Sequence, residues 1–195
     1  MNLLNKIKEL KDGNIGELIS KRVKEFKELG LKDERELFKE VCFCILTANF
    51  NAERGIEIQN KINDGFFTLS EEKLALRLRE LGYRFPNVRA SYIVEARKHK
   101  LELDRDWVVK NIKGLGMKEA SHFLRNVGFE DYAIIDFHIV DILVDNKLIE
   151  RPKNLNAKKY IEIENVLKEL GKKVELNMAE LDIYLWYLET GKVLK

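Results

Sequence analysis

The chain has 195 residues, of which 45% are hydrophobic and 35% are charged. This composition excludes an intrinsically disordered chain, and the length is sufficient for a hydrophobic core that needs no disulfide or metal ion. The 35 basic and 33 acidic residues leave a formal net charge of +2, which excludes a uniform polycation but allows a local basic face.

The N-terminal segment, residues 1–13, mixes Lys and Glu with Leu and Ile and lacks the apolar core of a secretory signal. No stretch of the sequence reaches the apolar length of a membrane span. We therefore expect an intracellular protein, in the cytoplasm or nucleoid, with no targeting signal and no membrane partner.

Apolar residues recur at three- or four-residue spacing along most of the chain, which is typical of amphipathic helices. The clearest face begins near Leu37 and includes Cys42, and Cys44 lies in the same apolar segment. We expect both cysteines to be buried, reduced thiols, because no second Cys or His cluster completes a metal site. Further helices are predicted over about 71–81, from about Pro86 to 97, and over about 174–189.

Period-two alternation is not sustained anywhere in the sequence, so we predict an all-α protein of about ten helices. The sequence has no internal repeat or flexible linker. Five glycines stand where predicted helices should end, namely Gly30, Gly65, Gly82, Gly128 and Gly171.

Residues 108–121 predict two short helices joined by a Gly-x-Gly turn. Gly114 and Gly116 allow backbone angles that side chains would forbid, and they let main-chain N–H groups approach a ligand closely. The helix that follows offers free N–H groups and a positive dipole to an anion. Such a hairpin can hold duplex DNA by its phosphates without reading sequence. On glycine spacing alone, an ordinary helix–turn–helix elbow is the better interpretation.

Lys118 lies one turn into this second helix, beside the predicted phosphate site. Eighteen residues later (136 minus 118), Asp136 follows an apolar run and precedes an apolar helix, which is the position of a helix N-cap. Taken singly, an exposed lysine and a capping aspartate are the simpler interpretations. Together, after a Gly-x-Gly hairpin, the two side chains indicate a more specific chemistry.

The stretch Gly114–Ala120, the eighteen-residue interval and the stretch Ile135–His138 resemble the helix-hairpin-helix DNA glycosylase superfamily. Three further segments resemble its compact archaeal-type 8-oxoguanine DNA glycosylase/AP lyase branch, namely residues 42–51, 122–128 and 185–195. The resemblance covers nearly the whole chain. The C-terminal cysteine cluster that marks the iron–sulfur branch is absent from the sequence.

The resemblance implies an all-α fold of two helical lobes, with a helix-hairpin-helix motif and an active-site cleft between the lobes. We expect a single domain over residues 1–195. One lobe, at about 30–130, contains the hairpin, and residues 1–29 together with 131–195 form the other.

In this family the lysine is the nucleophile and the aspartate assists, so the resemblance makes Lys118 and Asp136 the catalytic pair. The amine attacks C1′ of the deoxyribose and expels the base. The resulting Schiff base makes the 2′ proton acidic, so β-elimination nicks the strand 3′ to the lesion. The transition state is cation-like at the sugar, and a fixed carboxylate stabilises it. A hydrolytic glycosylase needs no amine, so Lys118 indicates a bifunctional enzyme.

The resemblance also assigns contacts with DNA. Asn49 is the expected wedge that fills the gap left by the everted base, and Arg54 is the expected contact to the unpaired cytosine. Alternatively, Asn49 is a helix C-cap and Arg54 a surface residue. Gly114 and Gly116 are expected to bind the DNA backbone, and His138 is expected to contact phosphate or to have a structural role.

The damaged base, 8-oxoguanine, differs from guanine by a proton on N7, so an acceptor placed there favours the lesion and leaves guanine unpaired. The resemblance assigns this discrimination to the chain end, where Lys195 offers a carboxylate and an amine. Trp186 is the expected companion, with simple core packing as the alternative. Phe85 is a weaker candidate for stacking. Relatives often have a polar or basic residue where this chain has Phe137, so one local contact differs.

No organic cofactor or redox metal is implied. The resemblance allows a monovalent cation on the hairpin carbonyls of Ile112 and Leu115, with no metal ligand from a side chain. The expected partner is duplex DNA containing 8-oxoguanine opposite cytosine, bound by a monomer. Two alternatives stay open: the same chemistry on another oxidised base, and a non-catalytic helix-hairpin-helix module that only holds DNA or a protein partner.

Overall fold

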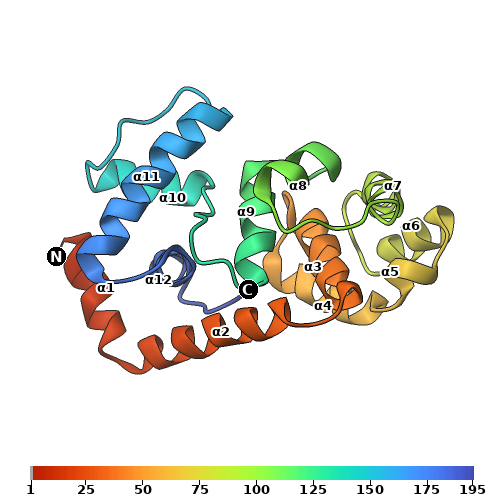
Figure 1. Cartoon of the computed structure of the whole chain (residues 1–195), viewed down its shortest axis with the longest axis horizontal. Helices are drawn as coiled ribbons and strands as arrows, with labels where there is room; N and C mark the ends of the chain where they lie inside the picture. The colour runs from red at the N-terminus through yellow and green to blue at the C-terminus, as the bar shows by residue number, and fades with distance from the viewer. Residues whose placement is uncertain (1) are drawn as a thin grey trace. The chain divides into compact units, whose positions relative to one another are not determined.

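In the computed structural model, residues 2–195 are described, and helices are the only regular elements in that range (Figure 1). This confirms the all-α prediction. The described residues form twelve helices where about ten were expected, because pieces as short as α5 leave no periodic pattern in the sequence. Their bounds are α1 (Leu3–Lys11), α2 (Asn14–Gly30), α3 (Glu34–Thr47), α4 (Ala52–Ile62), α5 (Gly65–Thr68), α6 (Glu71–Glu80), α7 (Pro86–Ala96), α8 (Arg105–Asn111), α9 (Met117–Asn126), α10 (Phe137–Asp145), α11 (Ala157–Val174) and α12 (Met178–Thr190).

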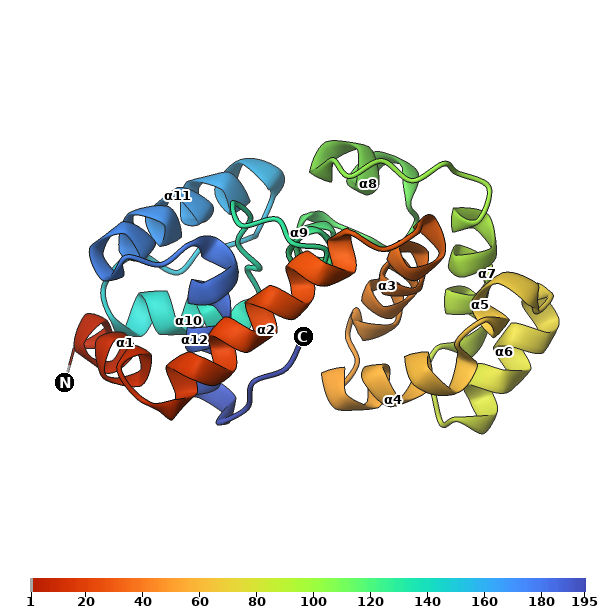
Figure 2. The same cartoon turned by 60° about the horizontal axis from the view of Figure 1, so that its bottom comes forward.

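The helices form two compact units. Unit 1 comprises Met1–Gly30 and Arg125–Lys195, and unit 2 comprises Leu31–Leu124. Unit 1 therefore holds α1, α2 and α10 to α12, whereas unit 2 holds α3 to α8 and most of α9 (Figure 2). Over residues 2–195, no helix combines the length and the apolar character needed to cross a bilayer.

The core of unit 2 is built around α3. Residues 41–46 are completely buried, so this part of the helix is apolar on every side. It packs against α4 and α7, and α6 packs on α7. Cys42 and Cys44 lie in this core as predicted. Burial raises the pKa of the Cys42 thiol well above its usual range, so the thiol is uncharged at neutral pH.

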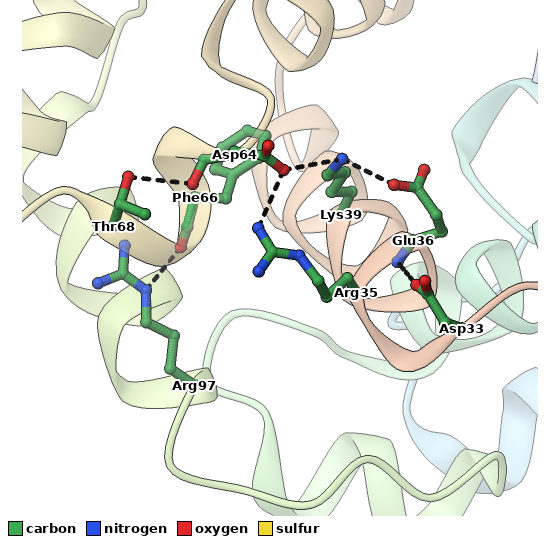
Figure 3. A network of polar contacts seen from close by, with 8 residues as sticks. All are labelled: Asp33, Arg35, Glu36, Lys39, Asp64, Phe66, Thr68 and Arg97. Carbon is green, nitrogen blue, oxygen red and sulfur yellow. Dashed lines mark hydrogen bonds and ion pairs between the residues drawn. The ribbon is translucent and has the colours of Figure 1, made fainter.

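The four-residue helix α5 is held between its neighbours by side chains (Figure 3). The Asp64 carboxylate, directly before α5, is bound by Lys39 at 3.2 Å and by Arg35 at 3.1 Å, both on α3. These hydrogen bonds lower the pKa of Asp64. Arg97, at the end of α7, donates to the Phe66 carbonyl at 2.6 Å. A helix this short is unstable alone, so contacts with α3 and α7 fix its place.

In unit 1, α11 packs against α12, and both pack against α1. Lys11, the last residue of α1, donates its amine to the carbonyls of Val174 and Glu175 at 3.0 and 3.3 Å. A cation there satisfies carbonyls that the end of α11 leaves without helical partners. Arg125 of α9 pairs with Asp182 of α12 at 3.4 Å, and both side chains are almost fully buried.

Two glycine predictions and one helix boundary are wrong. Gly65 begins α5 instead of ending a helix, because Asn63, with a φ of 44°, already ends α4. Gly171 lies inside α11, where an added Cβ would lie 2.6 Å from Cε of Met178 and 2.7 Å from the Leu176 carbonyl oxygen. The last helix begins at Met178 and not near 174, because α11 ends only at its C-cap Glu175, which is left-handed (φ 55°). Three glycines stand at helix ends as predicted, namely Gly30, Gly82 and Gly128.

Candidate active site

The predicted hairpin joins α8 to α9 through residues 112–116. The Ile112 carbonyl accepts the Leu115 N–H at 3.2 Å, which closes a tight turn. Arg105, at the start of α8, donates to the Ser121 hydroxyl of α9 at 3.3 Å, and both residues are buried. This bond ties the two helices together beyond the turn itself, so the start of α9 has a fixed direction.

Gly114 is required both by its backbone angle and by its surroundings. Its φ is +87°, a conformation that other residues rarely adopt, and an added Cβ would lie 2.6 Å from Cδ2 of Tyr92. At Gly116, an added Cβ would approach only the Glu119 carboxylate, at 3.4 Å. The Gly116 N–H itself is bound by Oε2 of Glu119 at 3.3 Å, and the binding of phosphate at this turn stays a prediction.

Lys118 is the second residue of α9, within the first helical turn as the sequence predicted. Its side chain is 33% exposed, and its amine lies 3.7 Å from the Glu119 carboxylate. The N–H groups and dipole at a helix N-terminus create a positive potential there. The amine is thus partly exposed at a helix terminus that attracts anions.

Asp136 is the N-cap of α10, also as predicted, and its Oδ1 accepts the Ile139 N–H at 3.0 Å. Capping uses one carboxylate oxygen and so gives the whole half-buried carboxylate a set direction. Asp136 belongs to unit 1 and Lys118 to unit 2. The approach of the amine to the carboxylate therefore stays a prediction.

The extended run that leads into Asp136 is fixed by two side chains of α11. Glu164 accepts the Ala133 N–H at 2.9 Å, and the Tyr160 hydroxyl accepts the Ile135 N–H at 3.0 Å. The same hydroxyl donates to the Ala133 carbonyl at 2.7 Å. All of these groups are buried, where unpaired backbone groups would be costly. The carboxylate is therefore carried by a rigid segment.

His138, in the first turn of α10, contacts two residues of α12. Its Nδ1 is 3.3 Å from the Glu189 carboxylate, and its ring meets Trp186 edge-on with centroids 6.1 Å apart. Trp186 is half-buried, and its indole N–H has no hydrogen-bond partner in the described part of the chain. Such a donor favours a ligand that brings an acceptor. His138 thus has a structural contact, and its binding of phosphate stays a prediction.

Phe85 and Lys195 are both accessible at their places in the fold. Phe85 directly precedes α7 and is 39% exposed, with the Arg84 guanidinium 4.9 Å from its ring centroid. Lys195 is half-buried at the end of the tail that follows α12. In this tail, Val193 borders an open surface pocket of about 400 Å³ together with Leu18 of α2. The role of the chain end in recognition stays a prediction.

Asn49 and Arg54 lie near the ends of helices in unit 2. Asn49 is exposed with a φ of 60°, directly after the C-cap Ala48 of α3, which is a common position for a left-handed asparagine. Arg89 of α7 donates to the Ala48 carbonyl at 3.0 Å and holds this turn. Arg54 donates to the Leu81 carbonyl at 2.9 Å. Both residues thus have structural roles, and their contacts with DNA stay predictions.

The hairpin carbonyls of Ile112 and Leu115 are chemically suited to a monovalent cation, because neutral oxygens are hard ligands. The Ile112 carbonyl accepts one hydrogen bond and keeps a second lone pair. Between residues 2 and 195, no three His, Cys, Asp or Glu side chains are grouped closely enough to hold a metal ion. A cation on the hairpin carbonyls stays a prediction.

Sequence reasoning missed three residues that support the site. Glu119 had a local signal, because a glutamate at the third helical position often caps the helix backbone. Glu164 and Tyr160 had none, since the backbone groups they bind lie 31 and 25 residues away in the sequence. Only the packing of α11 against the segment before α10 reveals them.

The protein family of this chain follows from a comparison with models of known families. Residues 19–176 match a family model described as 8-oxoguanine DNA glycosylase. That range includes the hairpin, Lys118 and Asp136. The chain belongs to the 8-oxoguanine DNA glycosylase family.

Several members of the 8-oxoguanine DNA glycosylase family match the chain over its whole length. The 8-oxoguanine DNA glycosylase/AP lyase of Methanocaldococcus jannaschii is 53% identical over 100% of both chains, and that of Korarchaeum cryptofilum is 49% identical over 100% of this chain and 98% of the relative. The M. jannaschii enzyme, crystallised with a 15mer DNA containing 8-oxoguanine, matches with a TM-score of 0.94 over 99% of both chains. The Thermotoga maritima 8-oxoguanine DNA glycosylase matches at 42% identity with a TM-score of 0.93, over 99% of this chain and 98% of that one.

Gly114→Ala should lower the free energy of unfolding of this glycosylase more than Gly191→Ala does. Both glycines are left-handed, which costs an alanine roughly 1–2 kcal/mol, but an added Cβ at Gly191 meets nothing within 4 Å. We expect an additional loss of about 1–3 kcal/mol at Gly114 from contact with Tyr92. Denaturant unfolding measures the free energy of unfolding of both variants. Equal losses would mean that Tyr92 moves aside without cost.

Proposed function

We propose that the chain is a bifunctional DNA-repair enzyme that excises 8-oxoguanine from duplex DNA and then nicks the strand 3′ to the lesion. The observation that carries this proposal is the match at 53% identity, over 100% of both chains, with the M. jannaschii enzyme named 8-oxoguanine DNA glycosylase/AP lyase. That relative has been solved on DNA containing 8-oxoguanine. The enzyme acts as a monomer inside the cell, where genomic DNA lies.

Lys118 supplies the amine that attacks C1′ of the damaged nucleotide. A C1′–N bond forms while the C1′–N9 bond breaks, and the base leaves with the electron pair and takes up the proton that the attacking amine gives up. Opening of the sugar ring gives a Schiff base, whose positive nitrogen acidifies the 2′ proton. Loss of that proton expels the 3′ phosphate by β-elimination. The place of Lys118 in the first turn of α9 supports this role. A hairpin that binds the DNA phosphate also holds the neighbouring sugar beside the lysine amine.

Asp136 stabilises the positive charge that develops at the sugar. Its Oδ1 is used by the cap of α10, which leaves Oδ2 for the substrate. Because Tyr160 and Glu164 fix the preceding backbone, the carboxylate need not reorganise when charge appears. Preorganised charge of this kind is usually the largest single contribution to catalysis.

Trp186 and the chain end read the damaged base. The lesion presents an N7–H that guanine lacks, and the terminal carboxylate of Lys195 is an acceptor for it. The indole N–H of Trp186 is buried without a hydrogen-bond partner among the described residues, so an acceptor on the base would satisfy it. Phe85 offers an exposed ring for stacking. Asn49 and Arg54 act on the other side of the everted base pair, as wedge and as contact to cytosine.

Lys118→Gln should abolish the covalent intermediate. Borohydride added during turnover should crosslink the wild type to a duplex containing 8-oxoguanine, because it reduces the Schiff base, and the variant should give no crosslink while still binding DNA. Lys113→Gln, which removes an exposed lysine of the same hairpin, is the matched control and should still be trapped. A Lys118→Gln enzyme that nicks at the normal rate would remove the lysine from the mechanism.

Asp136→Asn should separate the capping role of this residue from its charge. The amide oxygen of asparagine still caps α10, so the free energy of unfolding should stay close to that of the wild type. Loss of the charge should slow single-turnover base excision by roughly 10²–10³-fold. Asp33→Asn is the control, because Asp33 caps α3 through the same contact with Glu36 N–H. If both variants excise at the wild-type rate, Asp136 only caps its helix.

Removing Lys195 should weaken the preference for 8-oxoguanine over guanine more than it weakens cleavage at a preformed abasic site. Lys195→Ala keeps a terminal carboxylate at position 195, so comparing it with the deletion separates the carboxylate from the amine. Single-turnover rates on duplexes with 8-oxoguanine, guanine, thymine glycol or an abasic site measure these effects. Faster cleavage of thymine glycol than of 8-oxoguanine by the wild type would reassign the substrate.

A further inference from the structure

Glu119 uses both oxygens of its carboxylate at the start of α9. Oε2 accepts the Gly116 N–H at 3.3 Å, and Oε1 lies 3.7 Å from the Lys118 amine. The side chain is only 18% exposed, whereas that of Lys118 is 33% exposed. One carboxylate thus touches both the hairpin backbone and the proposed nucleophile.

The contact between these two neighbours is not the ordinary result of helix geometry. Consecutive residues on a helix point about 100° apart, so their side chains do not normally face each other. Here the carboxylate is drawn back toward the helix N-terminus by the Gly116 N–H, and this brings it beside Lys118. The same side-chain conformation thus makes the cap and the ion pair.

The glycine at the N-cap makes this arrangement necessary. The Gly116 carbonyl accepts the Ala120 N–H at 2.9 Å, which identifies Gly116 as the N-cap residue. A glycine has no side chain with which to cap the helix, so only the reciprocal half of a capping box can form, from Glu119 at the third helical position. The remaining N–H groups of the first turn are left for an anion.

We propose that Glu119 is a positioning residue that fixes the Lys118 amine relative to the hairpin, so that the phosphate grip and the nucleophile move as one rigid unit. This inference rests on the proposed role of Lys118. A free lysine side chain samples many rotamers and must lose that freedom before it attacks. An amine that is already held beside the carboxylate has lost part of this rotational freedom before the substrate binds. Reactants that are oriented in advance react faster for this reason.

A purely structural role makes different predictions from a positioning role. If Glu119 only caps α9, then glutamine should replace it fully, since a glutamine oxygen also accepts the Gly116 N–H. If Glu119 holds the Lys118 side chain, glutamine should preserve the stability of the fold but slow the chemistry. A neutral amide holds that side chain less firmly than a carboxylate does before the ammonium gives up its proton and the neutral amine attacks. DNA binding should not weaken, since the change removes a negative charge beside the hairpin.

Glu119→Gln should therefore reduce the single-turnover rate at a preformed abasic site about 10-fold, with unchanged melting temperature and no loss of affinity for a duplex carrying an uncleavable tetrahydrofuran site. Glu180→Gln is the matched control, because Glu180 makes the same capping contact with the Asn177 N–H, at 3.1 Å, on α12. It should leave the rate unchanged. Glu119→Ala should lower both the rate and the melting temperature.

Three outcomes separate this inference from the proposed function. A Glu119→Gln enzyme with wild-type rate would overturn the positioning role, even if Lys118→Gln abolishes the borohydride crosslink. A rate loss matched by a fall in melting temperature larger than that of Glu180→Gln would also overturn it, because the defect would then be structural. If Lys118→Gln were still trapped, the nucleophile itself would be wrong, and a slow Glu119→Gln enzyme would have another cause.

Discussion

The N–H groups at helix N-termini are the constraint on which the candidate site depends. The first turn of every helix leaves backbone donors without helical acceptors, and these must find another partner. At α10, the Asp136 side chain provides one. At α9, Gly116 cannot provide one with a side chain, so Glu119 reaches back to the turn. This requirement of the backbone orients the Asp136 carboxylate directly. At α9 it brings the Glu119 carboxylate to 3.7 Å from the Lys118 amine.

The rigidity of the Asp136 segment has a source deeper in unit 1. A buried carboxylate such as that of Glu164 is costly unless it is hydrogen-bonded, and its bond to the Ala133 N–H offsets that cost. Tyr160 both donates to and accepts from the same extended run. An extended segment outside any sheet would otherwise leave its buried N–H and carbonyl groups unpaired. The polar side chains of α11 thus form the hydrogen bonds to this backbone that a neighbouring strand would form in a β-sheet.

The contacts of His138 connect the capped carboxylate to the helix that carries Trp186. His138 follows Asp136 by two residues and contacts both Trp186 and Glu189 of α12. The first turn of α10 is thus in direct contact with α12. The tail that continues from α12 ends at Lys195, so the groups proposed to read the base and the carboxylate proposed to support cleavage share one connected part of unit 1.

The sequence by itself determined the helical class, the Gly-x-Gly hairpin and the local settings of Lys118 and Asp136, because these depend on periodicity, glycine conformation and capping within a few residues of chain. It misplaced the start of the last helix, since Glu175 adopts a left-handed conformation that no glycine signals. Only the tertiary structure decided that Glu164 and Tyr160 support the Asp136 segment and that Arg89 holds the turn at Asn49. Those contacts join residues far apart in the sequence, and such pairings depend on how helices pack, which no local pattern encodes.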